Sequence, residues 1–243
     1  MDEVMDGFVD IHTHILPGVD DGPKDILEAM ELARMAWEDG TGTLFLTPHY
    51  RGEYRENTPA WLRESFSLFC QMLQQSLPQM RLYLGSEAHY ETQLPRLLEN
   101  GAVLPLGCSH YVLLEFPYKA LRSQILEGTS EVLQSGFTPV IAHAERYDIF
   151  RKDAELADTV SDMGALIQLN AQSVMGAQGH AVKQYCHRLL KEEKAHFIAS
   201  DAHDVKRRPP LLQKCWRHVC KKYSRDYADA LFRKNAQNIL ADM

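Results

Sequence analysis

A short apolar run that ends in polar residues, followed by an amphipathic stretch, recurs seven times along this chain of 243 residues. The apolar runs are Phe8–Ile11, Thr43–Leu46, Arg81–Leu84, Tyr111–Leu114, Pro139–Ala142, Ala165–Leu169 and His196–Ala199. Runs this short and this apolar fit parallel strands that are buried on both faces. Repeated strand–helix units join such strands through right-handed crossovers. The pattern therefore predicts an α/β fold, and a distorted (β/α)7 barrel of the TIM type rather than an open sheet.

The amphipathic stretches predict the helices that connect the strands. Apolar residues recur with the helical period over Asp25–Asp39, Ala60–Gln75, Leu121–Gln134 and Lys183–Glu193. No low-complexity segment, repeat or linker divides the chain, and its 243 residues are close to the ~250 that an α/β barrel needs. We therefore expect residues 1–243 to form a single domain.

The composition of the chain limits which partners and which cellular compartment we expect. The formal net charge is −7 with neutral histidines, which argues against a nucleic-acid partner. The five cysteines are an odd number without tight spacing, which fits a reducing cytosol better than a disulfide framework. The acidic N-terminus resembles no targeting peptide, and no apolar run approaches the ~20 residues that span a bilayer. We expect a cytoplasmic protein without membrane insertion, and the sequence leaves its oligomeric state open.

Residue types that bind metal ions follow almost every predicted strand. In chain order the strand ends carry Asp10, His12, His14, His49, Glu87, Glu115, His143, Asn170, Asp201 and His203. Because the carboxyl ends of parallel strands meet at one rim of a barrel, these side chains should converge on one site. A lone histidine at a strand end is more often structural than a ligand. Here six of seven strand ends offer His, Asp or Glu, and burying so many titratable groups together without a cation is costly.

The ligand types indicate a catalytic metal site. His12 and His14 lie two residues apart, so a strand points both imidazoles to one face. Mixed imidazole and carboxylate ligands without thiolate suit Zn, Mn or Fe, and they favour a catalytic over a structural site. The residues alone leave open whether Asp20 or Asp21 reaches the metals from the turn after His14. His89 is a weaker candidate for a ligand.

The motifs together resemble a known family. DIHTHILPGVDDG, TPHY, GSE, LEF, AHAERY and SDAH with RRPP follow the order found in the polymerase-and-histidinol-phosphatase (PHP) superfamily. Within it they are most similar to the manganese-dependent tyrosine phosphatases of bacterial capsule and exopolysaccharide gene clusters. The match runs from about Asp10 to Pro210. The resemblance implies a PHP-type barrel with a trinuclear Mn²⁺ centre, in which Fe, Zn or Co could replace manganese.

The resemblance also assigns ligands to this sequence. His12, His14, Glu87 and Asp201 would surround one metal, Glu87, Glu115 and His143 the second, and Asp21, His49 and His203 the third. Asp21 matches the family position after the turn better than Asp20 does. Asp10 is expected to support the geometry of the histidines without ligating.

The resemblance also implies which residues bind the substrate phosphate and which could act as a general acid. Arg146 and Arg208 match the positions expected to hold the substrate phosphate. His203 is the nearest candidate for a general acid, although ligation would compete with that role. Ala144 stands where many relatives carry proline, a change that should affect loop stiffness more than ligation.

The sequence also separates two chemical routes. Divalent ions lower the pKa of a bound water, so a nucleophile is available near neutrality. Thiolate tyrosine phosphatases instead place a cysteine and an arginine six positions apart, and none of the five cysteines has an arginine six residues on. We therefore expect no covalent cysteinyl intermediate.

The activity implied by the resemblance is hydrolysis of phosphotyrosine in proteins. The implied partner is the tyrosine-rich tail of a membrane-associated bacterial autokinase. Two enzymatic alternatives stay open: a phosphatase of histidinol phosphate or another small phosphomonoester, and an amidohydrolase-type C–N hydrolase, which also uses paired histidines. A nuclease or editing domain and a non-catalytic regulatory module are the weaker readings.

Overall fold

The computed structural model describes residues 7–54 and 57–243. All seven predicted strands are present, and two of them continue as separate short strands after a break. The strands are β1 (Phe8–Thr13), β2 (Thr41–Leu46), β3 (His49–Tyr50), β4 (Arg81–Leu84), β5 (Glu87–His89), β6 (Tyr111–Glu115), β7 (Thr138–Ile141), β8 (Leu166–Asn170) and β9 (Phe197–Ala199). Every described pairing between them is parallel.

The two breaks divide the strands between two sheets. One sheet has the order β1-β2-β4 and the other β3-β5-β6-β7-β8-β9. Thr47-Pro48 separates β2 from β3, and Gly85-Ser86 separates β4 from β5. Proline has no N–H for a ladder bond. At Gly85 a Cβ would lie 3.1 Å from the Pro105 carbonyl oxygen, so another backbone approaches too closely for a side chain.

Bonds between β1 and the segment after β9 close the ring of strands. The Asp201 N–H donates to the His12 carbonyl at 3.0 Å, and the His14 N–H donates to the Ala202 carbonyl at 2.8 Å. The Asp10 carboxylate also accepts from the Ser200 N–H at 3.0 Å. The fold is therefore a distorted seven-stranded α/β barrel, as the sequence predicts.

Helices cover the outside of the barrel, and one of them, α11, closes its end. They are α1 (Ile26–Glu38), α2 (Pro59–Ser76), α3 (Leu94–Glu99), α4 (Arg122–Gln134), α5 (Asp148–Lys152), α6 (Leu156–Met163), α7 (Ala171–Met175), α8 (His180–Lys191), α9 (Gln213–Lys222), α10 (Arg225–Asp229) and α11 (Ala236–Ala241). All four helices predicted from periodicity are found with small shifts at their ends. Side-chain caps fix the starts of two of these four helices, because Asp25 accepts from the N–H groups of Leu27 and Glu28, and Thr58 accepts from Trp61 N–H. None of the helices in the described ranges is long and apolar enough to cross a membrane.

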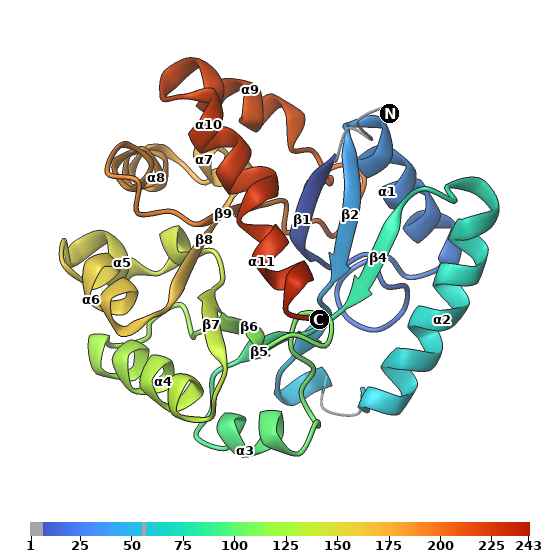
Figure 1. The fold of residues 1–243 in the computed structure, drawn as a ribbon, viewed down its shortest axis with the longest axis horizontal. Helices are drawn as coiled ribbons and strands as arrows, with labels where there is room; N and C mark the ends of the chain where they lie inside the picture. The colour runs from blue at the N-terminus through green and yellow to red at the C-terminus, as the bar shows by residue number, and fades with distance from the viewer. Residues whose placement is uncertain (1–6, 55–56) are drawn as a thin grey trace.

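An apolar cluster, which we call the base, fills the interior of the barrel beneath the carboxyl rim. Val9, Phe45, Leu113, Val140 and Phe197 belong to one buried cluster together with residues of α11. Figure 1 shows α11 lying across the centre of the ring of strands. The closed lower end leaves the carboxyl rim as the place where polar side chains from the strands converge.

Candidate metal centre

The carboxyl rim gathers all nine side chains that the sequence predicts as ligands. Eight are buried, with exposed fractions of 7% or less: His12, His14, His49, Glu87, Glu115, His143, Asp201 and His203. Asp21 comes from the loop after β1, and its side chain keeps 40% of its surface exposed. Their ligand roles stay a prediction, but the structure brings all of them to one place.

The ligand atoms of these residues form three tight groups that could each hold a cation. The groups are His14, Asp21, His49 and His203; His12, His14 and Glu87; and His49, Glu87 and Glu115. Within each group the atoms lie within 4.8 Å of one another. The groups share His14, His49 and Glu87, so three cations bound here would be neighbours. They overlap with the predicted sets, but His14 and His49 each contact one more set than the resemblance assigns.

Asp201 and His143 lie beside these groups rather than inside them. Asp201 Oδ1 is 3.5 Å from the Nε2 atoms of both His12 and His14. His143 Nε2 is 2.7 Å from Glu87 Oε1 and 3.9 Å from Glu115 Oε1. Both residues have left-handed backbones, with φ of 55° at Asp201 and 34° at His143. Non-glycine residues rarely adopt this conformation, and such strain is typical of functional positions.

A local irregularity in β1 helps bring the paired histidines to the rim. Three residue steps from Asp10 to Thr13 stand opposite two steps in β2, from Leu44 to Leu46. Such an extra residue bends a strand and re-aims its side chains. The result confirms the common face predicted for the two histidines, because His12 Nε2 and His14 Nε2 lie 3.1 Å apart.

The turn after His14 answers which aspartate faces the cluster. Asp21 Oδ1 lies 3.3 Å from His49 Nε2 and 3.2 Å from His203 Nε2. Asp20 instead accepts from His14 Nδ1 at 2.7 Å and from the His49 N–H at 3.1 Å. Asp20 therefore orients His14 from behind and leaves its Nε2 directed at the cluster.

The ion pairs of the cluster raise the pKa of several histidines. Burial lowers the pKa of His49, but Glu87, Asp21 and Asp20 raise it more, to about 11. The same balance raises the pKa of His143 to about 9, with Glu87 as the main carboxylate. A field that holds protons this strongly also attracts divalent cations.

Several buried polar atoms support a cation at this place. Glu87 Oε2, His49 Nδ1 and His203 Nε2 are buried and have no hydrogen-bond partner. Glu87 Oε2 and His49 Nδ1 are nevertheless 2.8 Å apart, so they approach closely without hydrogen-bond geometry. Imidazole nitrogens and carboxylate oxygens that converge without hydrogen-bond geometry fit a shared metal ion, and the mixed imidazole and carboxylate set suits Mn, Fe or Zn.

A pocket of about 350 Å³ opens onto the cluster. It is lined by Asp21, His49, Arg51, Glu87, Glu115, Tyr118, His143, Arg146, Asp201 and Arg208. The predicted phosphate-binding arginines are both present: Arg146 Nη1 lies 3.1 Å from Asp201 Oδ2, and Arg208 Nη2 lies 3.4 Å from Asp21 Oδ2. The described lining contains no cysteine, which agrees with the absence of a thiolate motif.

The sequence analysis did not identify two residues that line the pocket, Tyr118 and Arg51. The guanidinium of Arg146 lies over the Tyr118 ring at 4.9 Å, and Arg146 Nη2 also donates to the Tyr118 hydroxyl. Arg51 lies over the Tyr54 ring at 5.5 Å. Arg51 follows His49 at the spacing that shares a strand face, and this signal could have identified it.

Comparison with known proteins agrees with this geometry. The family described as "Capsular polysaccharide synthesis, CpsB/CapC" matches residues 8–241. The tyrosine-protein phosphatase CpsB of Streptococcus pneumoniae is 31% identical over 240 residues, which cover 97% of this chain and 99% of that protein. This chain belongs to the CpsB/CapC family. The resemblance inferred from the motifs is thereby confirmed.

Further relatives extend the same likeness. The tyrosine-protein phosphatase YwqE of Bacillus subtilis (strain 168) is 33% identical over 202 residues, or 83% of this chain and 79% of that protein. A solved structure from work on YwqE of Bacillus subtilis and CpsB of Streptococcus pneumoniae, described as unique metal-dependent tyrosine phosphatases, matches with a TM-score of 0.90. The two chains are 30% identical, and the match covers 97% of this chain and 95% of that chain.

Two further residues that the sequence analysis considered, His89 and Asp10, lie beside the proposed metal cluster. His89 Nδ1 is 3.0 Å from Glu115 Oε2 but belongs to none of the three groups. Asp10 contacts the N–H groups of His12 and Ser200 through Oδ1, which fits the supporting role expected of it. Burial raises the pKa of Asp10 to about 6.

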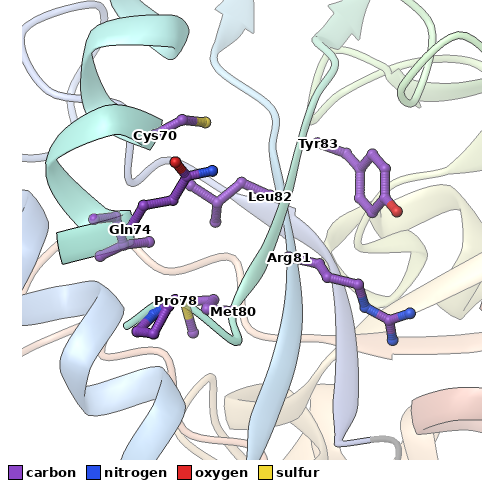
Figure 2. A pocket seen from close by; sticks show the side chains of 8 residues that line it. Cys70, Gln74, Pro78, Met80, Arg81, Leu82 and Tyr83 are labelled. Atoms are coloured by element: carbon purple, nitrogen blue, oxygen red, sulfur yellow. The ribbon is translucent and has the colours of Figure 1, made fainter. Parts of the chain in front are cut away.

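A second cavity, on the flank of the barrel, has different lining residues from the rim pocket. It measures about 310 Å³ and lies between α2 and β4, beside Cys70, Gln74 and Leu82. In Figure 2, Leu82 points toward α2, whereas Arg81 and Tyr83 point to the other side of β4. Its described lining offers no histidine or carboxylate, so of these two cavities only the rim pocket has the residue types that bind metal ions.

Proposed function

We propose that this chain is a metal-dependent protein-tyrosine phosphatase, formed by residues 1–243 as a single domain. One observation carries the proposal: a pocket lined by arginines opens onto a buried cluster of histidines and carboxylates. Similarity over nearly the whole chain to proteins named tyrosine-protein phosphatases supports it. Binding by the arginines and metals would neutralise a phosphate dianion.

The proposed cofactor is three Mn²⁺ ions, with Fe, Zn or Co as substitutes. The proposed ligands are His12, His14, Asp21, His49, Glu87, Glu115, His143, Asp201 and His203. Bound divalent ions would supply a deprotonated water as nucleophile and neutralise phosphate charge. Asp20 and the Asp201 carbonyl hold the Nδ1 atoms of His14 and His203, so that their Nε2 atoms face the pocket.

Arg146 and Arg208 are proposed to hold the phosphate. Each guanidinium contacts a site carboxylate through one nitrogen, and each keeps further N–H donors for phosphate oxygens. The planar fork of arginine matches two oxygens of one phosphate. The two side chains would therefore orient the phosphorus toward the ligand cluster.

The leaving group needs little help. A phenol has a pKa of about 10, so the tyrosine side chain can leave as a phenolate without a strong general acid. His203 remains the nearest candidate for that role, but its Nδ1 lies 2.9 Å from the Asp201 carbonyl and its Nε2 lies 3.2 Å from Asp21 Oδ1. We therefore propose His203 as a ligand first and as an acid second.

The proposed substrate is the phosphorylated, tyrosine-rich tail of a membrane-associated autokinase of capsule or exopolysaccharide synthesis. The proposed compartment is the cytoplasm, where such a tail would be reached. Family membership in capsular polysaccharide synthesis supports this assignment. No nucleic-acid partner is proposed, since the net charge is −7.

A substrate panel with added Mn²⁺ tests the proposal. The purified chain is assayed on a phosphotyrosine peptide, p-nitrophenyl phosphate, histidinol phosphate and a dihydroorotase-type amide. We expect the phosphotyrosine peptide to be the best substrate and a chelator to abolish its hydrolysis. Cys108→Ser should retain activity, because Cys108 lies outside the described lining of the pocket.

Other outcomes of the panel would replace the function. A strong preference for histidinol phosphate would keep the metal chemistry and change the substrate class. Hydrolysis of the amide without any phosphoester would overturn the phosphatase proposal altogether. Loss of activity in Cys108→Ser with the metals still bound would overturn the metal route.

A further inference from the structure

The strand β8 carries no histidine or carboxylate at its end, yet its side chains contact three proposed ligands, His12, His143 and Asp201. Along β8, Ile167 and Leu169 pack in the outer apolar core. Gln168 and Asn170 alternate with them, and both amide side chains are buried. Buried amides are costly unless they are bonded, so their partners define their role.

The orientation of the Gln168 amide follows from one partner that can only donate. The backbone N–H of His143 lies 2.8 Å from Gln168 Oε1, so this atom must be the oxygen. The same oxygen is 3.1 Å from His12 Nδ1. His12 Nδ1 must therefore carry the proton, and the lone pair of His12 sits on Nε2, beside His14 and Glu87.

The orientation of the Gln168 amide also fixes that of Asn170, which contacts the proposed ligand Asp201. Gln168 Nε2 donates to Asn170 Oδ1 at 2.8 Å, which leaves Asn170 Nδ2 to donate to Asp201 Oδ2, also at 2.8 Å. Arg146 Nη1 donates to the same oxygen of Asp201. Asp201 Oδ2 is thus bonded twice, and Oδ1 is the oxygen that faces His12 and His14.

We propose that Gln168 and Asn170 act as a directional amide relay, which fixes the Nδ1–H tautomer of His12 and selects Oδ1 of Asp201 for metal binding. The two side chains are positioning residues, since each acts through a ligand. The relay rests on the proposed function for the presence of metal and adds which atoms of two ligands take part. It also couples His12 to Asp201, although the two come from opposite ends of the chain.

The test measures Mn²⁺ binding rather than turnover. Metal-stripped protein and its variants are titrated with Mn²⁺, and bound metal is counted by elemental analysis. Gln168→Met removes both halves of the relay, and we expect metal affinity to fall by roughly 10–100-fold. Gln168→Glu keeps an acceptor for His12 and should recover part of that loss. Asn170→Leu should affect only the Asp201 half.

The double variant is the decisive comparison. Because Gln168→Met already releases Asn170, the relay predicts that adding Asn170→Leu weakens metal binding little further. Independent roles would instead multiply the two losses. Unchanged metal affinity in Gln168→Met, or losses that multiply, would overturn the relay.

Two controls separate the relay from folding and from the phosphatase proposal. Gln237→Met and Asn238→Asp change exposed amides on α11 and should bind metal as the parent does. Melting of every variant in chelator reports folding without metal, and if Gln168→Met does not fold, Gln168→Glu and Asn170→Leu still decide. Relay-dependent metal binding without phosphotyrosine hydrolysis would overturn the function alone.

Discussion

The two ends of the barrel use the same strands for opposite purposes. Beneath the rim, Val9, Phe45 and Val140 fill the interior, and α11 seals the amino end. At the carboxyl rim, the continuations of these strands bury histidines and carboxylates within a few ångströms of one another. Apolar burial stabilises one end, whereas the other end holds charges that are costly to bury without cations. The barrel thus separates stability from chemistry along its axis.

The difference predicts which measurement a substitution should affect at each end of the barrel. A change at the base should alter the free energy of unfolding and leave metal binding intact. A change at the rim should alter metal binding or turnover with a smaller effect on folding. Four substitutions test this division, beginning with the largest expected effect.

Glu87→Gln should have the largest effect on activity. Glu87 lies within 3.4 Å of ring nitrogens of His12, His14, His49 and His143, so it contacts more histidines than any one of the three groups contains. We expect kcat/KM on a phosphotyrosine peptide to fall by about 10³-fold or more, because transition-state charge loses its neutralising cations. Near-normal turnover with a full metal complement would contradict a shared ligand at this position.

Phe45→Ala should have the largest effect on stability. Phe45 is fully buried in the base and stacks on Tyr83, with ring centroids 5.1 Å apart. The cavity should lower the free energy of unfolding by about 3–5 kcal/mol, measured by urea denaturation. Turnover per bound metal should stay at the parent level. A loss of bound metal in the folded fraction would show that the two ends are coupled.

Arg146→Lys should lower catalysis without removing metal. Lysine keeps the charge but loses the two-pronged geometry that arginine offers a phosphate. We expect kcat/KM to fall by about 10²-fold, with metal content unchanged. The matched control is Arg217→Lys, an exposed position on α9 outside the rim pocket, which should leave kcat/KM unchanged. Equal losses in both variants would remove the special role of Arg146.

Ile239→Val should have the smallest effect. Ile239 is fully buried on α11 and contributes to the seal at the base. Loss of one methylene group should lower the free energy of unfolding by about 0.5–1.5 kcal/mol. Metal affinity and turnover should match the parent protein. A measurable change in Mn²⁺ affinity would mean that the seal supports the rim.

The seven strands were predictable because each is a local apolar run, but their breaks were not. The break at Gly85 depends on the approach of Pro105 and Leu106, which lie far along the chain. The rim strands β3 and β5 are two and three residues long, too short for any periodicity. Tertiary contacts, rather than local preference, define both features.

The site was predictable where the residue type itself carries the chemistry. Histidines and carboxylates at strand ends pointed to one rim, and the structure gathers them there. Gln168 was missed because it lies within the apolar run Ala165–Leu169, where one polar residue has no distinguishing signal. Tyr118 was missed because only the fold brings its ring under Arg146. The choice between Asp20 and Asp21 needed three-dimensional contacts, since both occupy one turn.

The breaks after β2 and β4 have a consequence for how such a barrel could diversify. The lower pieces pair within the sheet β1-β2-β4, whereas the upper pieces β3 and β5, with His49 and Glu87, pair within the other sheet. Each break therefore separates a lower segment, which pairs within one sheet, from an upper segment that carries a site residue and pairs within the other. Evolution or design could therefore replace β3 and β5 to obtain a new reaction, while β2 and β4 keep the barrel folded.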